Sequence, residues 1–279
     1  MDDGTRVVLP LISTSVRRVF KKYVSMKPGV YGGPVTDGRP LQQGEIDAIL
    51  RTVISPRTAQ ISITGNPLGP CRLPHQFQVI EDFTQILDLR KGFDIAYRNW
   101  SKGHRWAPRK AQREGISVRP ASTEAEVLKY FRCYQDSLRR WGDRTTSSYP
   151  ITLFLNMFER RGDNAQLWLA FWKGIVVAGS VVFYHGRHAV YWHGAALEEF
   201  FDKYPNNLLQ YEIIKDSSSR GIEFYDFNPS GSAGSLEGVV KFKSHFGANK
   251  YPINRWHWDS PILKALDSAR HRLGVHRDR

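Results

Sequence analysis

The most concentrated chemistry in the sequence is a basic segment between residues 98 and 119, which holds seven Lys or Arg residues and one acid. Arg105, Arg109 and Arg113 recur at i, i+4 and i+8, a spacing that would place them on one face of a helix. Guanidinium groups bind phosphate through two parallel hydrogen bonds. This face, together with Lys110, is therefore a candidate site for a phosphate backbone or a pyrophosphate. An exposed, charged linker helix would have the same pattern.

The predicted limits of this helix follow from Pro108 and Gly115. Proline is well tolerated only in the first turn of a helix, so the helix is expected to start near Ala107 and to stop at Gly115. The whole chain has 40 Lys and Arg against 27 Asp and Glu, a net charge of +13. Such a charge favours nucleic acid, a phosphorylated small molecule or an acidic surface as ligand, although a basic surface with no ligand is also compatible with it.

Histidines and cysteines give little sign of a metal site. His185, His188 and His193 flank a predicted hairpin turn, but no Cys or carboxylate accompanies them at ligand spacing, so no metal is expected. The two cysteines, Cys71 and Cys133, stand in unrelated contexts. This excludes a disulfide scaffold and a cysteine zinc cluster and fits a reducing compartment.

Location is predicted from what the sequence lacks. No run of about 18 apolar residues occurs, and the N-terminus has neither a basic region nor an apolar region typical of a secretory signal. We therefore expect a cytoplasmic protein, one that could act at the inner membrane surface.

The second half of the chain predicts an α/β domain with a mixed sheet. A short strand, "GISVRPAS", is followed by a helix over 123–142, which Thr123 can cap. Three apolar runs separated by tight turns then predict an antiparallel meander. A helix over 206–221, the strand "IEFYDFNP", a Gly/Ser loop, a short helix and a last strand complete the order.

The first half repeats part of this order. Strands are expected in "RVVLPLIST" and "KYVSMKPGVYGGPV", a helix in "LQQGEIDAILRTVI" and a strand in "AQISITGNP", which ends in Asn-Pro as "IEFYDFNP" does. A strand–strand–helix–strand unit thus occurs twice, which indicates an internal duplication. The first copy lacks the opening strand and helix. We expect a truncated first lobe over 1–96, a basic connecting helix over 97–115, a complete second domain over 116–256, and a C-terminal helix with a basic tail over 257–279.

These stretches resemble a known family. "ISVRPASTEAEVLKYF", the meander and the following helix are similar to the Gcn5-related N-acetyltransferase (GNAT) fold, and the doubled arrangement resembles its FemABX peptidyltransferase branch. That branch has a Tyr-Gly-Gly turn in the first lobe, here Tyr31, Gly32 and Gly33. It also has a basic helix between the lobes, and a glycine-rich loop before a Phe-Lys pair and an aromatic-glycine pair, here Phe242-Lys243 and Phe246-Gly247. The resemblance covers roughly residues 7 to 256.

The resemblance implies transfer of an activated acyl group to a primary amine. FemABX proteins take it from aminoacyl-tRNA and give it to the peptide of a cell-wall precursor, whereas their relatives are thought to use an acyl-coenzyme A. The helical arm of some tRNA-using members is absent here, although some members lack it. The glycine-rich pyrophosphate loop of coenzyme A users is also absent, since the matching segment reads "FFDKYPNNLL". Backbone amides at Asn206 and Asn207 could still hold a phosphate.

Catalytic roles are predicted for three residues. By its match to the Phe-Lys pair, Lys243 would stabilise the oxyanion, and Phe242 would stack on the terminal base of the donor. His193, whose ordinary pKa is near 6.5, and Asp226 are the candidate bases. The alternatives are a solvated lysine, a histidine packed between aromatic residues, and an aspartate that fixes the Gly/Ser loop. Glu237 as the base, and catalysis assisted by the substrate, also stay open.

The acceptor would be bound by the first lobe and by a loop of the second. In the FemABX branch the tyrosine-glycine-glycine turn sits beside the acceptor cleft, and Arg144 and Tyr149 correspond loosely to acceptor contacts. The acceptor itself could be a cell-wall precursor, an amino sugar or a peptide. We carry three hypotheses: a transferase that uses aminoacyl-tRNA, one that uses acyl-coenzyme A, and a non-catalytic relative that binds RNA or the cell envelope.

Overall fold

The computed structural model describes residues 4–16, 18–26, 30–37, 39–69, 72–142, 145, 148–229, 237–263 and 265. The chain forms two compact units: unit 1 comprises 1–83 and 252–279, and unit 2 comprises 84–251. The boundaries predicted from the sequence lay near 96 and 256. The chain passes from one unit to the other within a strand on both occasions.

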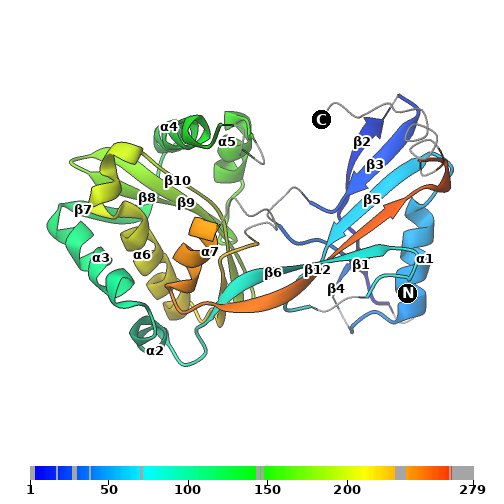
Figure 1. The fold of residues 1–279 in the computed structure, drawn as a ribbon, viewed down its shortest axis with the longest axis horizontal. Helices are drawn as coiled ribbons and strands as arrows, with labels where there is room; N and C mark the ends of the chain where they lie inside the picture. The colour runs from blue at the N-terminus through cyan, green and yellow to red at the C-terminus, as the bar shows by residue number, and fades with distance from the viewer. Residues whose placement is uncertain are drawn as a thin grey trace. The chain divides into compact units, whose positions relative to one another are not determined.

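The secondary structure follows the predicted order closely (Figure 1). The strands are β1 (Val7–Val8), β2 (Ile12–Val16), β3 (Phe20–Val24), β4 (Val35–Thr36), β5 (Thr58–Thr64), β6 (Gln78–Asp88), β7 (Ile116–Pro120), β8 (Ala165–Trp172), β9 (Ile175–His185), β10 (His188–Ala196), β11 (Phe224–Asp226) and β12 (Asn249–Asp259). The helices are α1 (Gln43–Val53), α2 (Phe93–Arg98), α3 (Lys102–Arg113), α4 (Glu124–Trp141), α5 (Ile151–Glu159), α6 (Pro205–Ser219) and α7 (Glu237–Ser244), with the 3-10 helix η2 (Glu198–Lys203).

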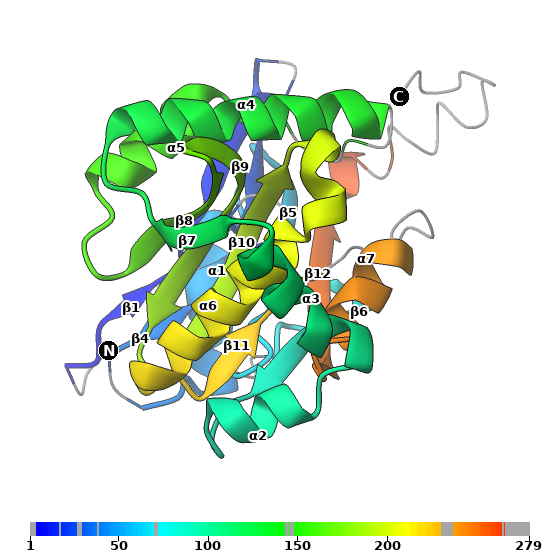
Figure 2. The ribbon, with the colours of Figure 1, turned by 90° about the vertical axis from the view of Figure 1, so that its left-hand side faces the viewer.

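Unit 2 is built on a mixed sheet in the order β6-β11-β10-β9-β8-β7. Strands β8 to β10 form the predicted antiparallel meander, the predicted opening strand β7 pairs antiparallel with β8, and β10 pairs with β11 in parallel across α6. Helices cover both faces, α3 and α6 on one side and α4 and α5 on the other (Figure 2). Successive residues of β8 therefore enter opposite cores, Leu169 that of α4 and Ala170 that of α6. Burial on both faces explains why these strands read as continuous apolar runs.

Unit 1 has a smaller mixed sheet in the order β2-β3-β5-β12. Ile46 and Leu50, one turn apart on α1, pack against Ile61 and Ile63 of β5, and Trp256 of β12 belongs to the same core. The short strands β1 and β4 pair separately. The mixed α/β class predicted from the sequence is confirmed.

The predicted duplication is visible in the strand pairing. In unit 1 an antiparallel hairpin, β2-β3, is followed by α1 and by β5 parallel to β3; in unit 2 the hairpin β9-β10 is followed by α6 and by β11 parallel to β10. In each copy, the last strand pairs on its other side with a strand from the opposite half of the chain. β5 of unit 1 pairs with β12 from the end of the chain, and β11 of unit 2 pairs with β6 from its first half.

Three local expectations need correction or fall outside the description. The basic helix α3 begins at Lys102, not near Ala107, because Ser101 caps it and Pro108 is accommodated inside it. Helices α2 and α5 were not predicted; the polar residues of α5 are only Thr152, Asn156 and Glu159, which form its exposed face. The predicted C-terminal helix and tail lie largely outside the described residues, while β12 extends to Asp259.

No helix among the described residues is long and apolar enough to cross a bilayer.

Candidate active site

Lys243 lies on α7 and is almost completely buried, with 4% of its surface exposed. Its ammonium group donates a hydrogen bond of 2.7 Å to the backbone carbonyl of Asn228. Burial lowers the pKa of Lys243 from its ordinary 10.5 to about 8, and the nearby Asp226 carboxylate opposes this fall. The ammonium therefore remains largely charged at neutral pH inside the protein, rather than solvated on the surface.

Asp226, at the end of β11, organises the turn that holds this carbonyl. One carboxylate oxygen accepts hydrogen bonds from the Thr84 hydroxyl (2.6 Å) and from the backbone N–H of Asn228 (2.7 Å). The other lies 3.3 Å from the imidazole Nε2 of His188. Asn228 has a φ of 64°, a left-handed conformation that asparagine tolerates better than most residues. The fully buried aspartate thus fixes the backbone to which Lys243 binds, which accounts for a charge on an apolar strand.

Phe242 connects α7 to the basic helix α3. Its ring centroid lies 5.3 Å from that of His104 on α3 and 5.1 Å from that of Phe246. The N–H of Ser101, the residue that caps α3, donates to the carbonyl of His245 just after α7. Burial, and secondarily the neighbouring His245, lowers the pKa of His104 to about 4, so this contact is made by a neutral imidazole at pH 7.

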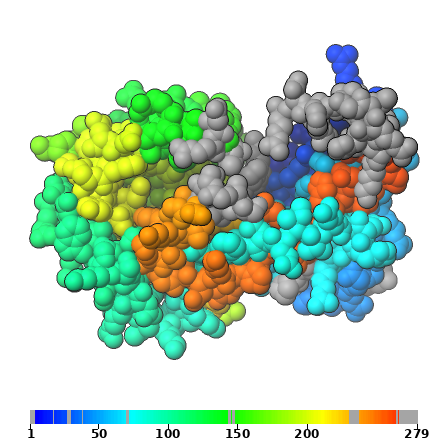
Figure 3. Space-filling model, viewed as in Figure 1, coloured from blue at the N-terminus to red at the C-terminus, as the bar shows by residue number. Residues whose placement is uncertain are grey.

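Helix α3 presents its cations to solvent. Its buried positions, Ala107, Pro108 and Ala111, face α6, and small side chains there allow the two helices to pack closely. Arg105, Arg109 and Arg113 are exposed. In the view of Figure 3, α3 reaches the surface at the left-hand edge and α7 lies on the same face. The structure therefore brings three predicted donor-binding features, the arginine row, Lys110 and Phe242, onto neighbouring helices.

The start of α6 carries the other predicted donor residues, Asn206 and Asn207. Tyr204 precedes the helix in a left-handed conformation, and Pro205 occupies its first turn. Proline has no N–H, and the amides of Asn207 and Leu208 donate to the carbonyl of Tyr204. Asn207 is buried. The first turn of α6 thus uses two of its own amide donors internally and differs from a glycine-rich phosphate loop.

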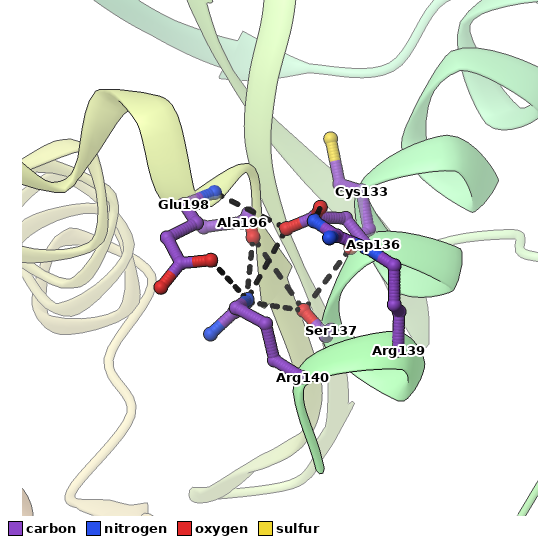
Figure 4. A network of polar contacts seen from close by, with 7 residues as sticks. All are labelled: Cys133, Asp136, Ser137, Arg139, Arg140, Ala196 and Glu198. Atoms are coloured by element: carbon purple, nitrogen blue, oxygen red, sulfur yellow. Dashed lines mark hydrogen bonds and ion pairs between the residues drawn. The ribbon is translucent and has the colours of Figure 1, made fainter. Parts of the chain in front are cut away.

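A polar network holds the segment that leads into α6 (Figure 4). Arg140 of α4 donates to the carbonyl of Ala196 at the end of β10 (2.9 Å) and to the hydroxyl of Ser137 (2.9 Å). The carboxylate of Asp136 accepts from the N–H of Glu198, the first residue of η2. These contacts fix the path of the chain from β10 to Tyr204, and so the position of the α6 start.

His193 lies in a separate aromatic group on the α4 face of the sheet. Its Nδ1 shares a hydrogen bond with the hydroxyl of Tyr130, and its ring packs edge-on against Tyr134, 4.6 Å away, and against Tyr149, 5.9 Å away. Burial lowers the pKa of His193 to about 4. His193 and Tyr149, predicted as a base and an acceptor contact, are thus neighbours. Their group is distinct from that of Lys243 and Asp226, which lies between β11 and α7.

The sheet opens between β10 and β11. β10 pairs with β11 only from His188 to Val190, whereas it continues alongside β9 as far as Ala196, with a bulge between Tyr191 and His193. β11 ends at Asp226. The two parallel strands therefore separate near the middle of β10, and His193 stands in the part beyond the separation.

Tyr31, Gly32 and Gly33 belong to unit 1, and the other predicted site residues that the structure describes belong to unit 2. The N–H of Gly32 donates to Thr64 at the end of β5, and a Cβ at this position would lie 2.3 Å from the hydroxyl oxygen of Ser25. Gly33 has a φ of 103°, which favours glycine. The turn is therefore required by local packing. Arg144 and the Gly/Ser loop over 230–236 lie outside the described residues.

Unit 1 also contains a hollow of about 440 Å³ between α1 and residues 72–76. The predicted site residues do not line it. Its walls are Gln43, Asp47, Arg51, Arg72, Leu73, Pro74, His75 and Gln76.

Several residues of the site were not singled out from the sequence. Thr84 and Asn228 act through a hydrogen bond to Asp226, which no spacing rule indicates because Thr84 is 142 residues away. Tyr204 and Trp106 lie beside Lys110, whose ammonium is 4.9 Å and 5.5 Å from the two ring centroids. The position of Trp106 inside the row of cations was a signal that the sequence did offer.

Comparison with known proteins places these features in a family context. A family model described as an acetyltransferase (GNAT) domain matches residues 98–243, just over half of the chain. A lipid II:glycine glycyltransferase from Staphylococcus haemolyticus is 29% identical over 89 residues, which are 32% of this chain and 20% of the glycyltransferase. The match thus spans about a fifth of that relative's length.

Solved structures show the same fold at low sequence identity. A crystal structure of FemX has a TM-score of 0.66 at 14% identity and covers 95% of this chain and 90% of its own. The C-terminal domain of a putative lysylphosphatidylglycerol synthetase from Agrobacterium fabrum has a TM-score of 0.59 at 11% identity, covering 95% and 88%. L-PGS from Bacillus licheniformis has a TM-score of 0.57 at 11% identity, covering 96% and 88%.

Proposed function

Because the chain belongs to the acetyltransferase (GNAT) domain family, we propose that it is an N-acyltransferase that moves an aminoacyl group from aminoacyl-tRNA to a primary amine. The observation that carries the proposal is Lys243. Its charged ammonium is buried and held by Asn228, and its own helix contacts the basic helix α3 through Phe242. A charge stabiliser and a phosphate-binding surface are thereby fixed with respect to each other.

The reaction is the aminolysis of an ester. The neutral acceptor amine attacks the carbonyl carbon of the aminoacyl ester, and the carbonyl oxygen becomes an oxyanion. Collapse of this intermediate breaks the ester C–O bond. The proton lost by the amine ends on the ribose hydroxyl that leaves, so atoms and charge balance. The ammonium of Lys243 would stabilise the oxyanion, an effect worth roughly 3–4 kcal/mol in a site shielded from water.

The pKa directions limit the choice of base. His193, with its pKa lowered to about 4, is neutral at pH 7 and can accept a proton, but only weakly. Asp226 already accepts two hydrogen bonds and has His188 beside it, so a structural role explains it fully. We propose that proton transfer is assisted by the substrate, with the leaving ribose hydroxyl receiving the amine proton directly or through water.

Two features favour aminoacyl-tRNA over acyl-coenzyme A as the donor. The first turn of α6 lacks a glycine-rich loop and begins with Tyr204 and Pro205, which leaves few backbone amides for a pyrophosphate. The five cations of α3 form a row without an acid inside the helix, which suits a polynucleotide. The family description as an acetyltransferase favours acyl-coenzyme A, which we keep as the second candidate donor.

The acceptor is proposed from the relatives. The glycyltransferase named for lipid II, and the similarity to FemX, support a primary amine on a cell-wall precursor, with an amino sugar or a free peptide amine as the alternative. Tyr149, in the aromatic group around His193, is the proposed acceptor contact of unit 2. Such an acceptor would place the enzyme in the cytoplasm, at the inner membrane surface.

The test is a transfer assay with the purified full chain. The protein is incubated with tRNA charged with a mixture of labelled amino acids and with amine acceptors of the three classes, and label in amide linkage is measured. We expect transfer from charged tRNA but not from acetyl-coenzyme A, and Lys243→Met should slow it by roughly 100- to 1,000-fold. Thiol release from short acyl-coenzymes A, without transfer from charged tRNA, would instead establish the second donor. If the wild type transfers no faster than Lys243→Met from either donor, both donor hypotheses are refuted.

A further inference from the structure

We propose that the exposed face of α3 is an RNA-docking surface in which Trp106, beside Tyr204, stacks on a base of the RNA. The inference rests on the proposed function in taking the RNA to be the donor tRNA. It adds a base contact to the phosphate contacts predicted for the arginine row. Trp106 has 47% of its surface exposed, although it lies on a helix whose buried side already packs well with alanine and proline.

The position of Trp106 among the cations is the first argument. Lys102, Trp106, Arg109, Lys110 and Arg113 follow one another at i, i+4, i+7, i+8 and i+11, which is one face of a helix. The opposite positions, Ala107 and Ala111, are buried against α6. The indole of Trp106 lies on this basic face and is not part of the buried core cluster beneath the helix. Surfaces that bind single-stranded nucleic acid have this combination, in which cations contact the phosphates and an aromatic side chain stacks on a base.

The local order around Trp106 is the second argument. The Tyr204 ring packs edge-on to the indole, with centroids 5.5 Å apart and an interplanar angle of 80°. The ammonium of Lys110 lies 5.5 Å from the indole centroid and 4.9 Å from the phenol centroid. These contacts restrict the indole, so stacking on a base costs less conformational freedom than it would at an isolated exposed tryptophan.

The length of the cation row indicates a polynucleotide. From Lys102 to Arg113 the helix rises about 16 Å, at about 1.5 Å per residue. The row is longer than a single phosphate or pyrophosphate group, so it can contact several successive phosphates of one strand. Coenzyme A has only three phosphates, grouped on one nucleotide. The α3 row therefore fits RNA better than the compact charge of that thioester.

A membrane surface is also anionic, but α3 lacks the apolar face that such a surface requires. Interfacial helices insert several large apolar side chains on one side. Among the described residues of α3, Trp106 is the one large apolar side chain that is substantially exposed. The opposite side of the helix is occupied by α6. We therefore assign the surface to RNA, and lipid binding becomes an outcome of the test.

The experiment measures binding without chemistry. A fluorescein-labelled RNA hairpin, which carries the single-stranded 3′ end of a tRNA but no amino acid, is titrated with the full chain. Fluorescence anisotropy is followed at several salt concentrations. We expect Trp106→Ala to weaken binding roughly 5- to 150-fold, which corresponds to about 1–3 kcal/mol, and Trp106→Phe to restore most of it. The slope of log affinity against log salt should not change in either variant. Arg109→Ala with Arg113→Ala should reduce that slope by roughly 1.4 to 1.8.

A charge-matched control lies on the other face of the sheet. Lys129→Ala with Arg132→Ala removes two exposed cations from α4, which packs on the face opposite to α3. This double variant should keep at least most of the affinity and the full salt slope. Circular dichroism melts of every variant show whether the fold is retained, and Trp106→Phe keeps the test valid if Trp106→Ala proves unstable.

The outcomes separate this inference from the proposed function. Unchanged RNA affinity in a folded Trp106→Ala variant would overturn the inference even if transfer from charged tRNA is observed. Loss of binding to anionic vesicles, with RNA binding unaffected, would also overturn it and would assign the face to lipid. Weakened RNA binding in Trp106→Ala supports it even if no transfer is ever detected, because the probe carries no amino acid.

Discussion

Replacement of Lys243 by methionine separates the stability of the protein from its proposed chemistry. Methionine has nearly the length of the lysine stem and keeps the buried volume, but it removes the charge and the hydrogen bond to Asn228. If the ammonium stabilises an oxyanion, loss of one such donor should lower the transfer rate by roughly 100- to 1,000-fold.

The effect on stability should be much smaller, because two contributions oppose each other. Burial lowers the pKa of Lys243 from 10.5 to about 8, so keeping the ammonium charged at pH 7 costs the folded state about 3 kcal/mol. Removing the ammonium relieves this cost but leaves the Asn228 carbonyl without its lysine donor, which costs about 1–3 kcal/mol. We expect a net change of less than about 2 kcal/mol in the free energy of unfolding at pH 7.

The pH dependence of the unfolding free energy tests the direction of the Lys243 pKa shift independently. The lysine has a lower pKa in the folded state than in the unfolded state, so between pH 8 and 10.5 the unfolded chain binds more protons and stability rises with pH. Urea unfolding at pH 7 and pH 10 should therefore show that the wild type gains up to about 3 kcal/mol relative to Lys243→Met, since all other groups cancel in the difference. The transfer rate of the wild type should fall over the same range as the ammonium loses its proton.

Two results would refute this reasoning. If Lys243→Met transfers the aminoacyl group as fast as the wild type, the ammonium has no role in the reaction. If the difference in unfolding free energy between the two proteins stays constant from pH 7 to pH 10, the lysine does not titrate in that range. A variant that simply unfolds is recognised by its circular dichroism spectrum, in which case Lys243→Gln, which keeps a hydrogen-bond donor, takes its place.

Three further predictions concern the surroundings of the site. Because burial lowers the pKa of His193 to about 4, His193 should not produce an inflection near pH 6.5 in the pH dependence of the transfer rate. An inflection there that is present in the wild type and lost in His193→Asn would mean that His193 titrates as the base. Arg140→Gln should lower the free energy of unfolding by about 1–3 kcal/mol through its lost bonds to Ala196 and Ser137, whereas Arg139→Gln, whose side chain is 72% exposed, should change it by less than about 0.5 kcal/mol in the same urea titration. Gly32→Ala should lower the thermal midpoint by an amount equivalent to about 1–3 kcal/mol, because its Cβ would lie 2.3 Å from a serine oxygen, while Gly44→Ala in α1, with nothing within 4 Å, should leave it unchanged or raise it.

The sequence predicted those elements whose signals are local. Thr123 caps α4 as expected, the meander strands follow from β-branched runs and tight turns, and both copies of the hairpin–helix–strand unit appear. The exchange of β6 and β12 was not predicted, because a strand's apolar pattern shows that it is buried but not which strand it pairs with. The start of α3 was misplaced because a rule for proline in isolated helices was applied where close packing against α6 compensates for the lost hydrogen bond.

The candidate site was predicted by residue type but not by environment. Lys243 and Asp226 were named, yet the hydrogen bonds that join them through Asn228 depend on the meeting of β11 with α7 and with β6. His193 and Tyr149 were assigned different roles, and their contact arises because β10 and the segment before α5 face the same side of the sheet. Trp106 was overlooked, since only the structure shows which side of α3 is covered.

On the proposed function, the local structure at α6 and α3 explains how an anionic donor would be bound without a glycine-rich loop. Such a loop works by presenting backbone amides, which requires residues without a side chain near the phosphates. Here Tyr204 and Pro205 occupy that place, and two of the following amides donate to the Tyr204 carbonyl.

Anion binding then has to come from side chains, and α3 packs directly on α6 with five cations and no acid in its sequence. Side-chain binding of this kind is long in reach and sensitive to salt, so it suits an extended polyanion better than one pyrophosphate. The departure from the coenzyme A pattern and the basic helix are therefore two parts of one arrangement, and the network around Arg140 keeps the start of α6 in the place that this arrangement needs.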